Sequence, residues 1–295
     1  MSDNVRPVTV VTGSSSGIGR ATAVLLAARG HRVFATLRNP GKADKLLAMA
    51  EAAGTTVELV ALDVVDDASV RDGFAQIVAT AGPVDVLINN AGIGYNSVIE
   101  DTDLARAHDV FETNYWGAMR CTQAVLPAMR ERRSGHIVQV SSIAGLVSAP
   151  AQVIYTSSKW ALECMSEHLA MEAAHFGVRV SIVEPGVTRT AILAKNADLP
   201  QGTPYDWIYG REFAFYAAGI VANVQPDAVA ETIWTALNNP AAQLRYKVAW
   251  AAEELSAGRL DMSDEDWIAL AATPKDDDYY DGFKAAFGLD LRMGT

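Results

Sequence analysis

The sequence predicts an α/β fold in which a doubly wound parallel β-sheet of the Rossmann type carries helices on both faces. Over the first two thirds of the 295 residues, short runs rich in Val, Ile and Leu alternate with longer helical segments. These runs do not alternate apolar and polar residues, as expected for strands that helices cover on both faces. Strand–helix repetition of this kind implies parallel strands joined by crossover helices, and therefore three layers, α/β/α.

The same patterns place the individual elements. We expect strands at residues 8–11, 32–36, 56–62, 84–89, 135–141 and 179–184. We expect helices at residues 17–29, 43–53, 67–81, about 104–130, 153–176 and 226–238. We interpret residues 1–295 as a single domain, with its core at residues 5–190.

The pattern changes after Gly186. Residues 188–225 show no clear period and are rich in aromatic residues, so we expect a loop that covers the substrate. Residues 240–295 form a C-terminal extension rich in acidic residues, including Asp276–Asp278. A charged extension of this kind is typical of a solvated surface.

Composition excludes several classes of protein. The net charge of −11 argues against a nucleic-acid partner, because binding to phosphates needs a basic surface. The two cysteines, Cys121 and Cys164, and the five scattered histidines have no metal-ligand spacing, so we expect no metal. No apolar run approaches the roughly 20 residues that span a membrane. We therefore expect a cytoplasmic protein without a membrane partner.

The first expected strand leads directly into a glycine-rich turn and then a helix. Glycines allow the backbone to approach a pyrophosphate closely, and the amides at the helix N-terminus bind its negative charge. A simple tight turn is the alternative, but strand, turn and helix occur here in the order that a dinucleotide site requires. The candidate cofactor-binding residues in this segment are Gly13, Ser15, Ser16, Gly17, Ile18 and Gly19.

The end of the second expected strand bears on the choice of cofactor. An acidic residue here would bind the ribose hydroxyls of NAD(H). The sequence instead has Leu37 followed by Arg38, whose guanidinium can pair with a 2′-phosphate. A solvated loop arginine is the alternative. The pattern favours NADP(H) over NAD(H).

Two further expected strands also end in polar or small residues. Asp63, followed by Val64, can accept a hydrogen bond from the adenine amino group, or it can cap the next helix. Asn90, Ala91 and Gly92 follow the fourth strand, where small residues let the backbone pass beside the ribose. Ligands bind open α/β sheets at the carboxyl ends of the strands, so these residues complete the candidate cofactor site.

Tyr155 and Lys159 are the candidate catalytic pair. They are four residues apart in an expected helix, which places both side chains on one face. A phenol has a pKa of about 10, and an adjacent ammonium lowers it toward neutral pH. Ser142 can donate a hydrogen bond to a substrate oxygen, and Asn114 can bridge the lysine and solvent through water. Taken alone, the pair is an ordinary helix pair, and only the surrounding motifs favour catalysis.

Taken together, these motifs resemble the short-chain dehydrogenase/reductase family over roughly residues 5 to 190. The resemblance implies that Tyr155 is the acid–base, that Lys159 lowers its pKa and holds the nicotinamide ribose, and that Ser142 orients the carbonyl. It also implies that Asn114 carries the proton relay. Within the family, the sequence is most similar to the steroid- and retinol-dehydrogenase-like members. The last segment that carries the resemblance is Pro185, Gly186, Val187 and Thr188, of which Val187 and Thr188 would hold the nicotinamide carboxamide.

The resemblance therefore implies an NADP(H)-dependent oxidoreductase that acts on CH–OH donors and interconverts a secondary alcohol and a ketone. The aromatic segment after Thr188 favours a bulky apolar substrate. The family forms homodimers or homotetramers on its two long helices, where Trp116 and Trp160 are candidates for either the interface or the core. An epimerase or dehydratase that retains its cofactor and a non-catalytic NADP(H)-binding regulator are the alternatives.

Overall fold

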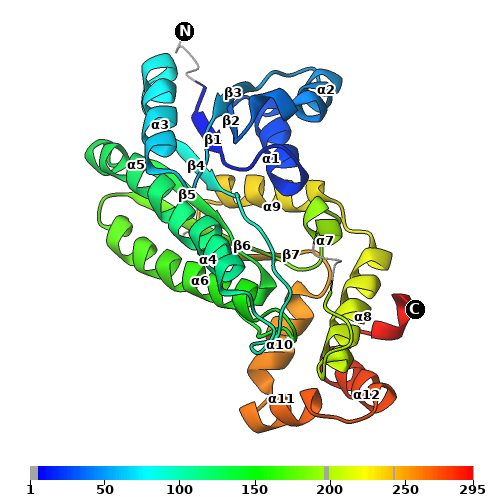
Figure 1. Cartoon of the computed structure of the whole chain (residues 1–295). Helices are drawn as coiled ribbons and strands as arrows, with labels where there is room; N and C mark the ends of the chain where they lie inside the picture. The colour runs from blue at the N-terminus through cyan, green and yellow to red at the C-terminus, as the bar shows by residue number, and fades with distance from the viewer. Residues whose placement is uncertain (1–5, 196–198, 242, 295) are drawn as a thin grey trace.

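Seven strands form one parallel sheet in a computed structural model that describes residues 6–195, 199–241 and 243–294 (Figure 1). The strand order is β3-β2-β1-β4-β5-β6-β7, so the direction of winding reverses between β1 and β4. A reversal of this kind opens a crevice at the carboxyl ends of the strands, where such sheets bind ligands. The strands are β1 (Val8–Val11), β2 (Arg32–Leu37), β3 (Glu58–Ala61), β4 (Val86–Asn89), β5 (Gly135–Val140), β6 (Val178–Pro185) and β7 (Arg245–Val248).

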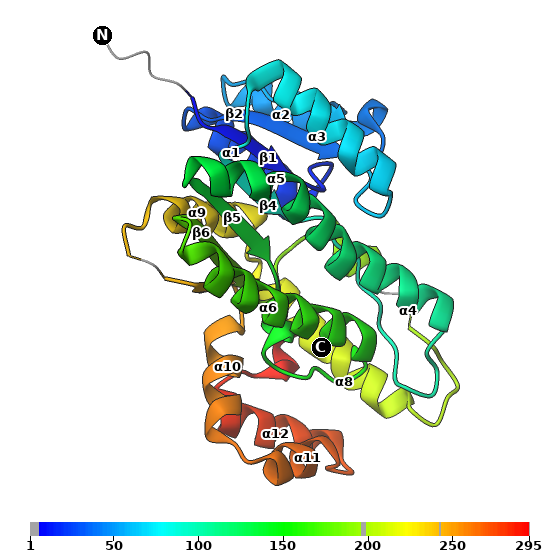
Figure 2. The same cartoon turned by 90° about the vertical axis from the view of Figure 1, so that its left-hand side faces the viewer.

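Helices cover both faces of the sheet (Figure 2). One face packs against α3 (Asp67–Ala81), α5 (Gly117–Arg132) and α6 (Val153–Ala174). The other face packs against α1 (Gly17–Ala28), α2 (Asp44–Ala52) and α9 (Pro226–Asn238). The prediction of a doubly wound parallel sheet in three layers is confirmed. The shorter elements of this region are α4 (Leu104–Phe111) and the single turns at Pro40–Lys42, Glu112–Trp116 and Ile143–Gly145.

Adjacent residues of each central strand enter opposite cores. In β4, Leu87 packs toward α3 and α5, while Ile88 packs toward α1 and α9. Both side chains are fully buried. Because successive side chains of a strand point to opposite faces, a strand covered on both sides has to be apolar throughout. The non-alternating runs in the sequence have this origin.

Two predicted segments differ from the structure. Residues 188–225, predicted to be a loop that covers the substrate, contain the helices α7 (Ala191–Lys195) and α8 (Asp206–Ala222); the covering role stays a prediction. The C-terminal extension is not merely a solvated surface, because it supplies β7 to the sheet and further helices to a third core. These are α10 (Ala252–Asp261), α11 (Asp264–Ala271), α12 (Asp276–Phe287) and the short turn Leu291–Gly294.

The third core lies under the carboxyl end of the sheet and joins four parts of the chain. Ile143, after β5, packs with Ala218 of α8, Leu255 of α10 and Phe283 of α12. Figure 1 shows α8, α10, α11 and α12 gathered below this end of the sheet. The third core thus builds walls beside the crevice. None of the helices over the described ranges is both long enough and apolar enough to cross a membrane.

We expect the buried His136 to make the fold sensitive to acid. Its Nε2 atom lies 2.9 Å from Ser181 Oγ on the next strand. Burial, aided by the positive charge of Arg179, lowers its pKa to about 3 from the ordinary 6.5. Between these two pH values the unfolded chain binds a proton that the folded chain does not. Stability therefore falls as pH falls, by about 1.4 kcal/mol per pH unit from this group.

Urea unfolding of the wild type and of His136→Asn between pH 6.5 and 4.5 measures this effect. The difference in the free energy of unfolding between the two proteins should change with that slope. His168→Asn, at an exposed position of α6, is the matched control. Parallel pH dependences of the wild type and His136→Asn would show that the ring is not held neutral.

Candidate active site

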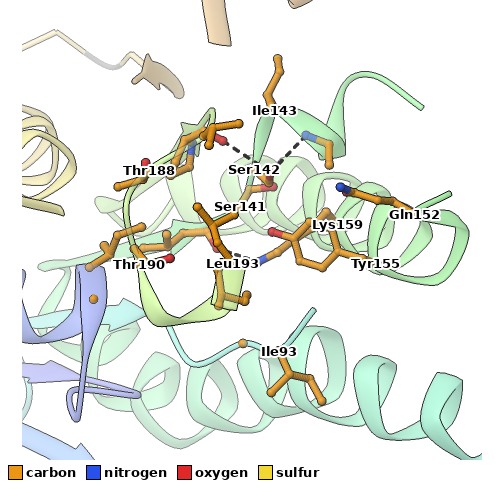
Figure 3. Close-up of a pocket in the computed structure, with 18 of the residues that line it drawn as sticks. Ile93, Ser141, Ser142, Ile143, Gln152, Tyr155, Lys159, Thr188, Thr190 and Leu193 are labelled. Carbon is orange, nitrogen blue, oxygen red and sulfur yellow. Dashed lines mark hydrogen bonds between the residues drawn. The ribbon is translucent and has the colours of Figure 1, made fainter. Parts of the chain in front are cut away.

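A cavity of about 580 Å³ lies at the carboxyl ends of the strands and extends toward α8 and α12. It brings together every predicted site residue except two, Gly19 and Asn114. Figure 3 shows Ser142, Tyr155 and Lys159 pointing into this cavity. The cavity therefore has a side formed by β1, β2 and β4, suited to a cofactor, and a side formed by the third core, suited to a substrate.

The glycine-rich turn is shaped by close contacts with the end of β4. Gly13 has φ +69°, and a Cβ atom added there would lie 2.8 Å from the Cα atom of Ala91. At Gly19, an added Cβ would lie 2.3 Å from the Asn90 amide nitrogen. Gly19 therefore lies behind the cavity wall, where it allows the helix to approach the strand. Both positions admit only glycine without a shift of the backbone.

The start of α1 fits an anionic group. Ser16 occupies the N-cap position with an extended backbone, and its side chain makes no capping hydrogen bond. The first turn of the helix, including Gly17 and Ile18, lines the cavity. Uncapped amides and the helix dipole favour negative charge at this point. The residues present therefore fit the diphosphate of a dinucleotide.

Arg38 lies where β2 ends, on the cavity wall, and is exposed. Among the described residues, its guanidinium has no hydrogen-bond or ion-pair partner. A planar group of five N–H donors in this position fits a phosphate monoester. The donor set thus suits the 2′-phosphate of NADP(H).

Asp63 and Val64 line the cavity next to Arg38. The Asp63 carboxylate accepts a hydrogen bond from the Val65 amide at 3.3 Å. Asp63 does not cap the next helix, because Asp66 accepts the capping hydrogen bond from the Ser69 amide at 2.9 Å. Of the two interpretations of Asp63, helix capping is therefore wrong, and binding of the adenine group stays a prediction.

Asn90 fastens the end of β4 to the glycine-rich turn. Its side-chain amide donates to the carbonyl of Thr12 at 2.8 Å, and its backbone amide donates to the Thr12 hydroxyl at 2.9 Å. The Ala91 amide donates to the same hydroxyl at 3.0 Å. With Asn90 held in this way, Ala91 and Gly92 line the cavity beside the turn.

Ser142, Tyr155 and Lys159 converge from two elements. Ser142 lies two residues after the end of β5 and caps the turn Ile143–Gly145, where its hydroxyl accepts a hydrogen bond from the Ala144 amide at 3.1 Å. Tyr155 and Lys159 lie one turn apart near the start of α6. The Lys159 Nζ atom donates to the carbonyl of Val140 at 3.0 Å and lies 5.8 Å from the centre of the Tyr155 ring. The geometry places a hydroxyl, a phenol and an ammonium on one wall.

Burial controls the proton affinity of this group. It raises the pKa of the Tyr155 phenol, and a hydrogen bond with Ser142 lowers it in part. Burial also lowers the pKa of Lys159 to about 8, which the negative charge of Glu163 opposes. The sequence predicted a lowered pKa for Tyr155, whereas the net shift in the structure is upward, because desolvation of the phenolate dominates. Tyr155 is consequently protonated at neutral pH, as a proton donor must be.

Asn114 is buried in a π-helical turn, Glu112–Trp116, that connects α4 and α5. Its amide group donates to the Ile93 carbonyl at 2.9 Å and to the Ser158 hydroxyl at 3.0 Å. Its carbonyl oxygen accepts from the Ile93 amide at 2.9 Å. The Asn114 side chain therefore links the segment after β4 to α6 through hydrogen bonds. It does not line the cavity. Its part in a proton relay stays a prediction.

Pro185, Gly186, Val187 and Thr188 border the cavity from the end of β6. The Val187 amide already donates to the carbonyl of Trp250 at 3.0 Å. The Thr188 hydroxyl donates to the Gly186 carbonyl at 3.3 Å, a long hydrogen bond that a ligand could replace. Thr188 is therefore the better placed of the two residues predicted to bind a carboxamide.

Several residues that line the cavity were not predicted from the sequence. Arg211, Glu212, Phe215 and Tyr216 of α8 line the cavity, since positions four apart share one helix face. The C-terminal extension contributes further side chains. These are Leu255, Trp267, Tyr279 and Phe283. Aromatic enrichment at residues 188–225 was the only signal for this wall, and nothing in the sequence indicated the contribution of the extension.

A cluster of ion pairs close to Lys159 was also not predicted from the sequence. Arg245 of β7 contacts Glu163, one turn after Lys159, and donates to Glu184 and Glu167 at 2.6 Å each. Glu163 and Glu184 are buried. Burial raises the Glu163 pKa to about 7, and Arg245 opposes this shift. The cluster joins the C-terminal extension to the helix that carries Tyr155.

Comparisons with known proteins agree with this geometry. The sequence profile described as short chain dehydrogenase matches residues 7–200. Retinol dehydrogenase 8 of Bos taurus is 38% identical over 260 residues, which cover 84% of this chain and 82% of that protein. The 17-beta-hydroxysteroid dehydrogenase type 1 of Mus musculus is 38% identical over 251 residues, which cover 81% of this chain and 72% of that protein.

Solved structures show the same likeness. A short-chain dehydrogenase from Streptomyces avermitilis superposes with a TM-score of 0.80 and 37% identity, over 88% of this chain and 94% of that one. The alcohol dehydrogenase from Thermococcus sibiricus, complexed with 5-hydroxy-NADP, gives a TM-score of 0.69 and 25% identity, over 83% of this chain and 96% of that one.

Proposed function

The chain belongs to the short-chain dehydrogenase family of oxidoreductases, as a member similar to the retinol and steroid dehydrogenases, and we propose that it interconverts a secondary alcohol and a ketone with NADP(H). The observation that carries this proposal is the convergence of Ser142, Tyr155 and Lys159 on one wall of a cavity whose other side fits a dinucleotide. A hydroxyl and a protonated phenol can polarise and protonate a carbonyl oxygen between them.

The mechanism follows from the positions of these side chains. When bound, NADPH would supply the hydride that reduces the carbonyl carbon. Ser142 donates a hydrogen bond to the carbonyl oxygen, and Tyr155 transfers its phenolic proton to it. The ammonium of Lys159 stabilises the phenolate that Tyr155 becomes. In the direction of oxidation, the Tyr155 phenolate accepts the proton of the alcohol.

NADP(H) is the cofactor that we propose, because Arg38 lines the cavity without a partner among the described residues and the end of β2 has no acidic residue. The alcohol dehydrogenase from Thermococcus sibiricus, which shares the fold, was solved with an NADP derivative. A carboxylate in place of Arg38 would instead bind the ribose hydroxyls of NAD(H).

A bulky, largely apolar substrate fits the rest of the cavity. Most of the wall on this side is apolar or aromatic, which favours a hydrocarbon skeleton. The side chains that support this part of the proposal are Ile143, Val147, Leu193, Phe215, Leu255, Trp267 and Phe283.

We also propose that the chain forms a homo-oligomer through α6 and the neighbouring turn before α5. Trp116 and Trp160 are 46% and 48% exposed, so neither belongs to the core of one chain. Met171, on α6, is 67% exposed. Large apolar side chains exposed on one face are typical of a surface that another protein covers.

A panel of ketones and alcohols, followed through the absorbance of NADPH, tests the proposed reaction. We expect lipophilic aryl and alicyclic ketones to oxidise NADPH, and the matching secondary alcohols to reduce NADP⁺ at higher pH. The rate of alcohol oxidation should rise with pH. Oxidation needs the Tyr155 phenolate, and because the pKa of Tyr155 is raised, this phenolate forms only at high pH. If the protein binds NADPH but turns over no compound of the panel, the alternative of a non-catalytic NADP(H)-binding regulator is favoured.

A further inference from the structure

A buried carboxyl group, that of Glu212 on α8, lines the substrate side of the cavity. Glu212 is 1% exposed. The Gln152 amide donates to a carboxyl oxygen of Glu212 and to the hydroxyl of Tyr216, and both of these neighbours also line the cavity. Tyr216 in turn donates to the Asn96 carbonyl oxygen at 3.5 Å. We refer to Gln152, Glu212 and Tyr216 as the polar cluster.

Among the described residues, no cation pairs with Glu212. Arg211, its neighbour in sequence, donates to Asp276 at 2.9 Å and to two carbonyl groups of the segment before α12. Burial raises the Glu212 pKa to about 8, although the hydrogen bonds of Gln152 and Tyr216 lower it in part. A buried acid without a cation lowers the stability of a fold, and an apolar side chain would fill the same space without that cost. Such a group on a cavity wall is a candidate for ligand recognition.

The polar cluster lies close to the reacting centre. Gln152 immediately precedes α6, whose first turn carries Tyr155, and Figure 3 shows both side chains at the cavity. Tyr216 is near enough to Tyr155 for the charge of one phenolate to raise the pKa of the other. Apart from the polar cluster, the substrate side of the cavity is lined largely by apolar and aromatic side chains, such as Ile143, Phe215 and Leu255. A ligand group that meets the polar cluster is thus attached near the carbon that reacts.

We propose that the polar cluster binds a hydroxyl group of the substrate, an inference that rests on the proposed function. The substrate is then a neutral hydroxy ketone, or the corresponding diol, with an apolar skeleton. A hydroxyl both donates and accepts, so it can donate to an oxygen of the Glu212 carboxyl and accept from the Tyr216 phenol, in place of the long 3.5 Å hydrogen bond from Tyr216 to Asn96. Among the described residues no free cation lies beside the polar cluster, because Arg211 pairs with Asp276, so a buried carboxylate or phosphate there would have no counter-charge and is disfavoured.

Benzoin and deoxybenzoin form a matched pair of probes, because they differ only in the hydroxyl beside the ketone. We expect the wild type to have a kcat/KM for benzoin at least about tenfold that for deoxybenzoin, since a site built to bind a hydroxyl rejects the analogue without it. In Glu212→Leu this ratio should fall to about one. Glu254→Leu, at an exposed position of α10 outside the cavity, is the matched control and should keep the wild-type ratio.

Equal kcat/KM values for the two ketones in the wild type, or an unchanged ratio in Glu212→Leu, would overturn the proposal. Should the leucine variant not fold, Glu212→Met has an unbranched apolar side chain of similar length, and the same loss of the ratio is expected. If neither ketone is reduced, the panel of ketones and alcohols decides separately whether the proposed function fails. Quenching of tryptophan fluorescence then measures the affinities of benzoin and deoxybenzoin for the NADPH complex of the protein. Equal affinities would show that the polar cluster does not bind the hydroxyl group.

Discussion

Replacing Tyr155 with phenylalanine should lower kcat by roughly a thousandfold while the affinity for NADPH changes little. The substitution removes one oxygen and keeps the ring that packs at the start of α6. Loss of a general acid typically costs 10²–10⁴-fold, and the tyrosine is the proton donor of the mechanism proposed above. Steady-state reduction of a lipophilic ketone and fluorescence titration with NADPH measure the two quantities.

Tyr246→Phe is the matched control for this prediction. Tyr246 is also buried, but it belongs to β7, outside the cavity, where its hydroxyl accepts a hydrogen bond from Asn239 at 3.0 Å. This variant should keep the wild-type kcat. A Tyr155→Phe enzyme with more than about a tenth of the wild-type kcat would contradict the assignment of Tyr155 as the acid.

Replacing Arg38 with aspartate should reverse the choice of cofactor. The change removes the donors that fit a 2′-phosphate and adds a carboxylate that repels it but can accept hydrogen bonds from ribose hydroxyls. We expect kcat/KM with NADPH to fall by roughly 100-fold and kcat/KM with NADH to rise, because charge-assisted hydrogen bonds contribute about 1.5–3 kcal/mol. Initial rates with both cofactors, at one ketone concentration, measure the ratio.

Arg71→Asp provides the control for the change in net charge. Arg71 is an exposed residue of α3, away from the cavity, and the substitution should leave the ratio of the two cofactors unchanged. Selectivity of Arg38→Asp equal to that of the wild type would show that the guanidinium is a solvated surface group, the alternative that the sequence left open.

The parts of the fold that were predictable are those in which one physical requirement controls consecutive residues. Leu87 and Ile88 are both apolar because both faces of β4 are covered. Gly13 is glycine because of its positive φ and its contact with Ala91. Tyr155 and Lys159 share a wall because they are one helical turn apart. In each case a short stretch of sequence shows the pattern that the requirement produces.

The parts that were missed depend on contacts between distant segments. Strand β7 reads Arg-Tyr-Lys-Val, with two charged residues, because it is an edge strand whose Arg245 pairs with buried carboxylates of β6 and α6. In α8, aromatic residues lie on the exposed side as well as the buried one, as Phe213 is 59% exposed while Phe215 lines the cavity. The helical period was therefore obscured. The burial of Glu212 depends on packing that no local pattern encodes.

The third core also determines the order in which a newly made chain can become functional. Domains fold as the chain leaves the ribosome, N-terminal parts first. The segments that line the cofactor side precede residue 191, so they leave the ribosome early. Strand β7 and Leu291, which is fully buried in the third core, are made later. The apolar wall for the substrate can thus form only after the segments of the cofactor side have been made, because Ile143 and Ala218 pack with Leu255 and Phe283.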